Sequence, residues 1–105
     1  MHFVYIIHSP GKDRYYVGES VNAVDRVKQH NAAFYNSAST SYARDWEIEL
    51  LIKTDSRSDA LLIEKHIKKM KSKKYIHRLC LDNGFQKIFE TQMNDQYGIS
   101  IQLKS

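Results

Sequence analysis

The fold is decided by Phe3-Val-Tyr-Ile-Ile7, which the turn sequence Ser9-Pro-Gly-Lys-Asp13 connects to Tyr15-Tyr-Val-Gly18. The two outer segments are β-branched and aromatic, and a Pro-Gly turn between such segments predicts a β-hairpin. If the turn is centred on the Pro-Gly pair, Tyr5 lies opposite Tyr16, and directly opposed Cβ atoms are roughly 4.5–5.5 Å apart. The two phenols could then share a site, although a slip of one residue would move the whole pattern to the other face.

A helix is predicted next, over residues 21–30. Its apolar stripe recurs at i, i+3 and i+6 and consists of Val21, Val24 and Val27. Ser20 or Asn22 can cap this helix, because each offers a side-chain oxygen to the free amides of the first turn. Arg26 and His30 are four residues apart and therefore lie on one face of the helix.

Residues 31–41 are polar and rich in small side chains, which predicts a loop. A third strand is expected over residues 46–53, where apolar and acidic side chains alternate. Its predicted apolar face consists of Trp46, Ile48, Leu50 and Ile52.

Two more helices are expected after this strand. Ser56-Arg-Ser-Asp59 is a capping pattern, and the helix that it opens should run to about residue 70. Its predicted apolar stripe is Ala60, Ile63, Ile67 and Met70. Ser72 can cap the following helix, and Asn83-Gly84 can end it with a left-handed C-cap. The inward side chains of that helix are predicted to be Tyr75, Ile76, Leu79 and Cys80.

The last segment has weaker patterns. Phe85, Ile88 and Phe89 look amphipathic, and residues 99–103 could form a short edge strand. The predicted fold class is therefore α/β (α+β), with a small central antiparallel three-stranded sheet flanked by helices.

The composition limits the class of protein. A chain of 105 residues with 42% hydrophobic and 27% charged residues is expected to form one globular domain. Cys80 is the single cysteine, which excludes an internal disulfide and a zinc site built on cysteines. A lone thiol is typical of a reducing cytoplasm. No apolar run approaches the roughly 18 residues of a membrane span. We expect a small, soluble, cytoplasmic domain without a membrane partner.

The excess of 16 basic over 12 acidic residues is concentrated in one region. Residues 65–78 contain seven basic side chains and no acidic one, whereas residues 43–64 carry a net charge of −3. Such a basic run raises the local potential and attracts polyanions. A solvated helix face is an equally good interpretation of the run on its own.

Glu64 is the most unusual acidic residue, because it projects beside the apolar stripe of its predicted helix. A carboxylate there is costly unless it is paired, hydrogen-bonded or bound to a cation. An ion pair with Arg57 or a nearby lysine and a cation-ligand role both remain open. The seven tyrosines are numerous for this length, although strand tyrosines usually serve packing.

Several of these elements together resemble a known family. Val4-Tyr-Ile6 and Tyr16-Val-Gly18 resemble the paired tripeptide signature of the GIY-YIG nuclease superfamily, with Val4 in place of the family glycine, as in its small single-domain bacterial branch. Gly18 to Asn31 is similar to that branch position by position, and Trp46 to Leu50 resembles its third strand. Ala60 to Lys68 resembles the helix with the acidic residue. The resemblance covers roughly residues 3–81. It implies a domain over residues 1–83, with residues 84–105 as an unassigned C-terminal extension of the same domain.

This resemblance implies a set of catalytic residues, namely Tyr5, Tyr16, Arg26, His30 and Glu64. One tyrosine would help to deprotonate the attacking water or to orient the phosphate. Arg26 would bind the scissile phosphate, and His30 would transfer a proton or bind phosphate. Glu64 would be the sole acidic metal ligand, which suits Mg²⁺ or Mn²⁺.

The resemblance and the basic run also suggest residues that bind substrate. Gly18 lets the backbone pass close to the site, and the loop before the third strand borders the substrate in the family, or it is merely a solvated linker. The predicted substrate-binding residues are Gly18, Ser39, Thr40, Arg44, Lys68 and Lys71.

The function implied is a divalent-metal-dependent endonuclease that hydrolyses DNA phosphodiester bonds, with structure-directed or weakly sequence-specific activity. DNA repair, recombination and DNA uptake are settings that fit it. One alternative is a non-catalytic nucleic-acid-binding module on the same scaffold. A weaker one is a protein-interaction domain with residues 85–105 as a dimer edge. We expect a monomer or a weak homodimer.

Overall fold

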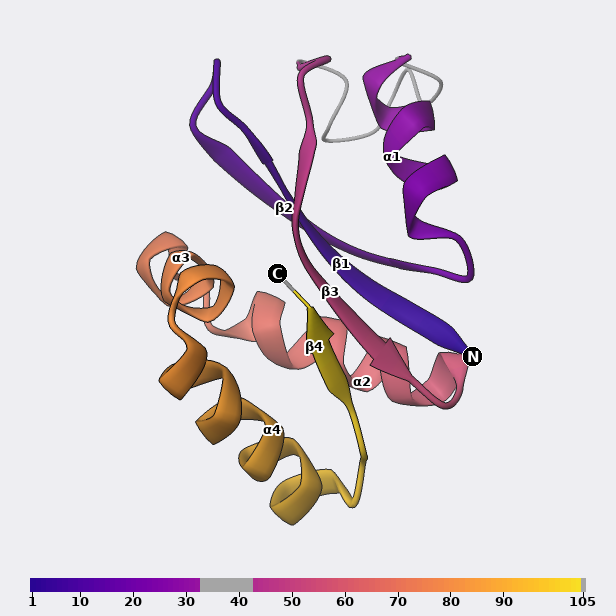
Figure 1. Cartoon of the computed structure of the whole chain (residues 1–105), viewed down its shortest axis with the longest axis vertical. Coiled ribbons are helices and arrows are strands. Elements are labelled where there is room, and N and C mark those ends of the chain that lie inside the picture. The colour runs from indigo at the N-terminus through magenta and orange to yellow at the C-terminus, as the bar shows by residue number, and fades with distance from the viewer. Residues whose placement is uncertain (33–42, 105) are drawn as a thin grey trace.

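The computed structural model describes residues 1–32 and 43–104. Within them the chain forms an α+β domain in which one sheet is flanked by helices (Figure 1). In chain order the elements are β1 (His2–Ser9), β2 (Arg14–Ser20), α1 (Ala23–Asn31), β3 (Glu47–Thr54), α2 (Arg57–Lys69), α3 (Lys73–Leu81), α4 (Asn83–Tyr97) and β4 (Gln102–Lys104).

The described strands form one antiparallel sheet in the order β2-β1-β3-β4. It has four strands where three were predicted, because the short edge strand expected near the C-terminus pairs with β3 as β4. Figure 1 shows α1 apart from the other three helices, with the sheet between them. No helix in the described ranges is long and apolar enough to cross a membrane.

The hairpin register differs from the prediction. Tyr5 lies opposite Gly18, and Tyr16 lies opposite Ile7, so the two tyrosines are diagonal neighbours and not a directly opposed pair. The cause is a longer turn: β1 ends at Ser9, β2 begins at Arg14, and the turn between them closes with Asp13 in the left-handed region (φ 51°). Tyr5 pairs with a residue two positions beyond the predicted one. Because this shift is even, both phenols remain on the same face of the sheet.

The two faces of the sheet carry separate hydrophobic clusters. Val4 and Ile6 of β1 pack with the α2 residues Ala60, Ile63 and Ile67 on one face. On the opposite face, Tyr5 and Ile7 pack with residues that precede or belong to other elements, namely Ala23, Val27, Ala43 and Trp46. The first face is therefore the α2 face, and the second is the α1 face.

The predicted single apolar face of the third strand is wrong. The pairing of β1 with β3 shifts between Ile6 and Ile7, which leaves Glu49 as an extra residue in β3. Such a bulge reverses the alternation of side chains. Consequently Ile48 packs on the α1 face, whereas Leu50 and Ile52 pack on the α2 face.

In α1 the predicted valine stripe is only partly correct. The helix begins at Ala23, with the Asn22 side chain accepting a hydrogen bond from the backbone N–H of Asp25. Val21 therefore precedes the helix, and it is 67% exposed, while Val24 is 51% exposed. The buried stripe is Ala23, Val27 and His30.

The second helix follows the prediction more closely. Ser56 caps α2 by accepting a hydrogen bond from the N–H of Asp59, and the first three stripe residues are fully buried. Met70 is exposed, because α2 ends at Lys69 and the chain turns away with Lys71 in the left-handed region (φ 47°).

The predicted glycine C-cap of the third helix is wrong. Asp82, in an extended conformation, ends α3 and also begins α4, where its carboxylate accepts a hydrogen bond from the N–H of Phe85. Gly84 thus lies in the first turn of α4. The left-handed cap is Gly98, at the end of α4. The segment after residue 83 contributes Phe89 and Met93 to the cluster on the α2 face.

Candidate active site

Three of the predicted catalytic side chains meet on the α1 face of the sheet. The Tyr5 hydroxyl and His30 Nε2 share a hydrogen bond of 3.0 Å. The ring centroids of Tyr5 and Tyr16 are 6.4 Å apart, and those of Tyr16 and His30 are 5.2 Å apart. The three residues come from β1, β2 and α1, so this cluster depends on how α1 packs on the hairpin.

The charge state of His30 follows from its surroundings. Burial lowers the pKa of His30 below its usual 6.5, and the positive charge of Arg26, one turn earlier on α1, lowers it further. The neutral imidazole therefore predominates at neutral pH, and it can accept a proton. Arg26 is partly exposed and lies close enough to His30 for its charge to be felt, as the predicted helical spacing requires.

Gly18 makes room for Tyr5. A Cβ atom at position 18 would lie 2.5 Å from the Tyr5 hydroxyl oxygen and 3.1 Å from Cε2 of Tyr16. Glycine is therefore required here by the tyrosine pair itself. Its predicted role in substrate binding stays a prediction.

Glu64 reaches the cluster through a lysine. Its side chain, on α2, is 16% exposed, and Oε2 accepts a hydrogen bond of 2.8 Å from Nζ of Lys68. The same ammonium lies 5.5 Å from the centre of the Tyr16 ring, within cation–π range. Of the ion pairs that were predicted for Glu64, the structure shows the one with a lysine; Arg57 lies near Glu19 instead.

Glu64 is the predicted metal ligand, and its described partner is the Lys68 ammonium. The described residues contain no group of three or more His, Cys, Asp or Glu side chains that could hold a metal ion. A single carboxylate suits Mg²⁺ or Mn²⁺, which keep several water ligands and bind substrate phosphate oxygens directly. Such an ion would share Glu64 with the Lys68 ammonium.

Comparison with known protein families gives a match over most of the chain. The family model described as the GIY-YIG catalytic domain matches residues 1–76. The chain belongs to the GIY-YIG family. A GIY-YIG catalytic domain is a nuclease domain, which implies phosphodiester hydrolysis with DNA as the substrate. No curated protein and no solved structure matches the chain.

The structure explains the departure of this GIY-YIG domain from the family signature at Val4. The Val4 side chain is fully buried on the α2 face, whereas its neighbour Tyr5 points to the α1 face. Residue 4 is therefore a packing position directed away from the tyrosine cluster, and valine adds buried apolar area there.

The structure does not bring the remaining predicted substrate-binding residues of the loop before β3 into the tyrosine cluster within the ranges it describes. Ser39 and Thr40 lie outside the described residues. Arg44 is exposed shortly before β3, and the structure records no contact between it and the tyrosine cluster within the described ranges.

Asn31 fixes the start of β3, because its side chain donates to the carbonyl of Trp46 and accepts from the Trp46 N–H.

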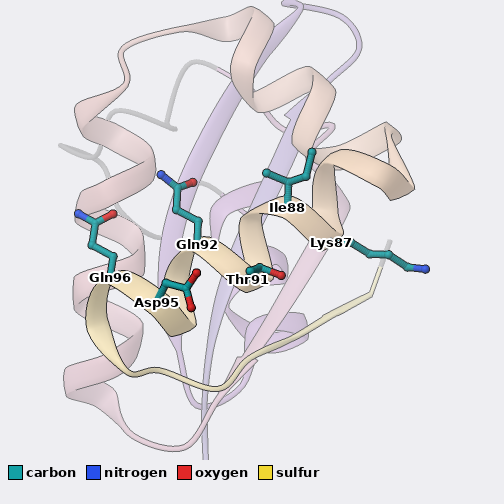
Figure 2. A pocket seen from close by; sticks show the side chains of 6 residues that line it. All are labelled: Lys87, Ile88, Thr91, Gln92, Asp95 and Gln96. Carbon is teal, nitrogen blue, oxygen red and sulfur yellow. The ribbon is translucent and has the colours of Figure 1, made fainter.

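Sequence reasoning missed two basic residues beside the site. A groove of about 440 Å³ runs between β2 and the turn from α2 to α3. Its lining includes Arg14 and Lys73 as well as Tyr16, Lys68 and Lys71. The available signal was the spacing of Arg14 and Tyr16, two residues apart on one strand and therefore on one face. A larger hollow lies along the outer face of α4, away from the catalytic candidates (Figure 2).

Proposed function

We propose that this GIY-YIG domain is a divalent-metal-dependent endonuclease that hydrolyses DNA phosphodiester bonds. The observation that carries the proposal is the meeting of Tyr5, Tyr16 and His30 beside Glu64, with Lys68 between them. We further propose structure-directed or weakly sequence-specific activity, a cytoplasmic location and a monomer or weak homodimer. The buried lone thiol of Cys80 fits a reducing compartment.

The two tyrosines are suited to different tasks. Tyr5 is 1% exposed and is hydrogen-bonded to His30, so it is a positioning residue that fixes the imidazole. Tyr16 is partly exposed and lies in the wall of the basic groove, so it is the tyrosine that can contact the attacking water or the phosphate. The neutral His30 accepts the proton that leaves this water, directly or through a phenol.

Positive charge is the second requirement of the reaction. Charge develops on the phosphate oxygens as water attacks, and donors fixed in advance stabilise it most. Arg26 supplies a guanidinium from α1, and Lys68 supplies an ammonium next to Tyr16. When bound, the metal ion supplies further positive charge, and Glu64 is the residue that would hold it.

The decisive experiment is cleavage of a panel of labelled DNAs: single-stranded, duplex, flap and junction, with RNA counterparts. Mg²⁺ or Mn²⁺ should support cleavage, and EDTA should stop it. Glu64→Gln and Tyr16→Phe should each abolish cleavage. Matched controls are Glu90→Gln, at an exposed position on α4, and Tyr75→Phe on α3, both of which should cleave as the unmodified protein does.

One observation favours a non-catalytic nucleic-acid-binding module as the second candidate. The Lys68 ammonium already neutralises Glu64, so the carboxylate is satisfied without a metal. That function predicts no cleavage of any panel member by clean protein, together with salt-dependent binding that persists in Glu64→Gln. This combined result would overturn the proposed nuclease activity.

A further inference from the structure

Tyr16 and Lys68 take part in the proposed reaction, but the other basic residues of the groove that they line have no role in it so far. Its walls are the edge strand β2 and the turn that joins α2 to α3. We propose that this groove binds the sugar–phosphate backbone of the substrate strand beside the bond that is cut. The proposal rests on the proposed function for the identity of the substrate, and it adds the path of the strand.

The charge of the groove is entirely of one sign. Four of its lining residues are basic and none is acidic. Lys68 and Lys73 each bind a carboxylate outside the lining, Glu64 and Asp13 respectively. For Arg14 and Lys71 the structure records no ion pair within residues 1–32 and 43–104.

Arg14 and Lys71 are therefore the two cations that a phosphate can take without displacing a carboxylate. Each lies on a different wall, Arg14 on β2 and Lys71 in the turn after α2, so a strand between them would be neutralised from both sides. Lys68 and Lys73 can add charge once their own carboxylates are bound elsewhere.

The position of the groove connects it to the site. Tyr16 lines the groove and also packs against His30, so the groove and the tyrosine cluster share one residue. Arg14 shares a strand face with Tyr16 and is about 7 Å away along β2. A strand held by Arg14 therefore continues past Tyr16, the residue that contacts the water or the phosphate in the proposed reaction.

The four basic side chains of the lining are suited to phosphate oxygens, which every nucleotide of a strand presents. Contacts to phosphate fix position and carry no sequence information. Binding through these phosphate contacts would therefore be the same for strands of different sequence.

The test is the salt dependence of binding by the full chain in EDTA, where no metal supports cleavage. Binding of a labelled single strand and of the matching duplex is followed by anisotropy between 50 and 200 mM salt. Each lost phosphate contact flattens the slope of log K against log[salt] by about 0.7 for a single strand and about 0.9 for a duplex. Arg14→Gln with Lys71→Gln should therefore flatten it by about 1.4 or about 1.8.

The matched control removes two exposed basic side chains elsewhere, Lys87→Gln on α4 with Lys104→Gln on β4, and it should leave the slope unchanged. The single variants Arg14→Gln and Lys71→Gln should each give half of the effect, and thermal unfolding shows that all variants are folded. Equal slopes for the groove variant and the unmodified protein would overturn the proposal, as would an equal loss in the control.

Cleavage separates the two proposals. If the unmodified protein cuts DNA, the groove variant should raise KM and leave kcat unchanged. Cleavage with an unaltered salt slope in the groove variant would overturn the groove alone. A flattened slope without any cleavage would support the groove and overturn the nuclease activity.

Discussion

Replacement of Gly18 by alanine tests the architecture of the site most directly. The added Cβ would lie 2.5 Å from the Tyr5 hydroxyl oxygen and 2.6 Å from Cζ of its ring. To reach even 3.4 Å, the hydroxyl would have to move by about 0.9 Å. Tyr5 cannot swing aside freely, because it is buried and hydrogen-bonded to His30.

Two effects of Gly18→Ala are expected. Overpacking of a filled site costs about 1–3 kcal/mol of the free energy of unfolding. For a domain near 100 residues each kcal/mol lowers Tm by about 4–8 °C. Displacement of a site residue by about 1 Å can slow catalysis about 100-fold. We therefore expect a lower Tm and a loss of cleavage of that order, together with a changed NMR titration of the His30 imidazole.

Gly84→Ala is the matched control for this substitution. Its Cβ would meet only the exposed carboxylate of Asp82, at 3.3 Å, and alanine is the better helix former in the first turn of α4. It should be neutral or stabilising by up to about 1 kcal/mol. If Gly18→Ala has the Tm, the His30 titration and the cleavage rate of the unmodified protein, the close contact with Tyr5 does not constrain position 18.

Three further predictions concern the core and its titratable groups. Phe89→Ala should lower the free energy of unfolding by about 3–5 kcal/mol in chemical denaturation, because Phe89 is buried in the core cluster. The neighbouring Ile88 side chain is 60% exposed, so Ile88→Ala should be nearly neutral. Burial raises the pKa of Cys80 to about 12, so a thiol reagent should label it only as the protein unfolds; rapid labelling of the folded protein would contradict its burial. Burial lowers the pKa values of His30 and His66 below 6.5, so the unfolded state takes up protons at a higher pH than the folded state. The free energy of unfolding should therefore fall as the pH drops below 6.5. In the double variant His30→Asn with His66→Gln, this fall should be smaller.

Local signals predicted the elements well. Ser56 and Ser72 cap the helices that their sequences indicate, because a cap depends on residues only three positions apart. The prediction that Tyr5 and Tyr16 share a face was also correct although the predicted register was wrong, because the register differs by an even number of residues. The spacing of four residues predicted Arg26 and His30 on one helix face, and the charge of Arg26 does act on the pKa of His30.

Features set by distant segments could not be predicted in the same way. The bulge at Glu49 arises where β3 pairs with β1, and the alternating sequence of β3 contains no signal that predicts it. Likewise, Asp82 replaced the expected glycine cap because α4 starts at once and needs an N-cap. In each case the outcome depends on another element of the fold and not on the local sequence pattern.

The edge position of β2 explains why Lys68 is part of the site. Tyr16 and Glu64 belong to different sides of the sheet, since Tyr16 packs on the α1 face and α2 covers the other. The inner strands are paired on both edges, so side chains from the two faces can meet only around an outer strand. Lys68 connects the two faces at the outer strand β2, because its ammonium contacts both Glu64 and the Tyr16 ring. A strand added beyond β2 would separate the carboxylate from the tyrosines and fill the basic groove. The site therefore requires that β2 stay unpaired along this edge, and the groove charges of Arg14 and Lys71 also disfavour the approach of another strand there.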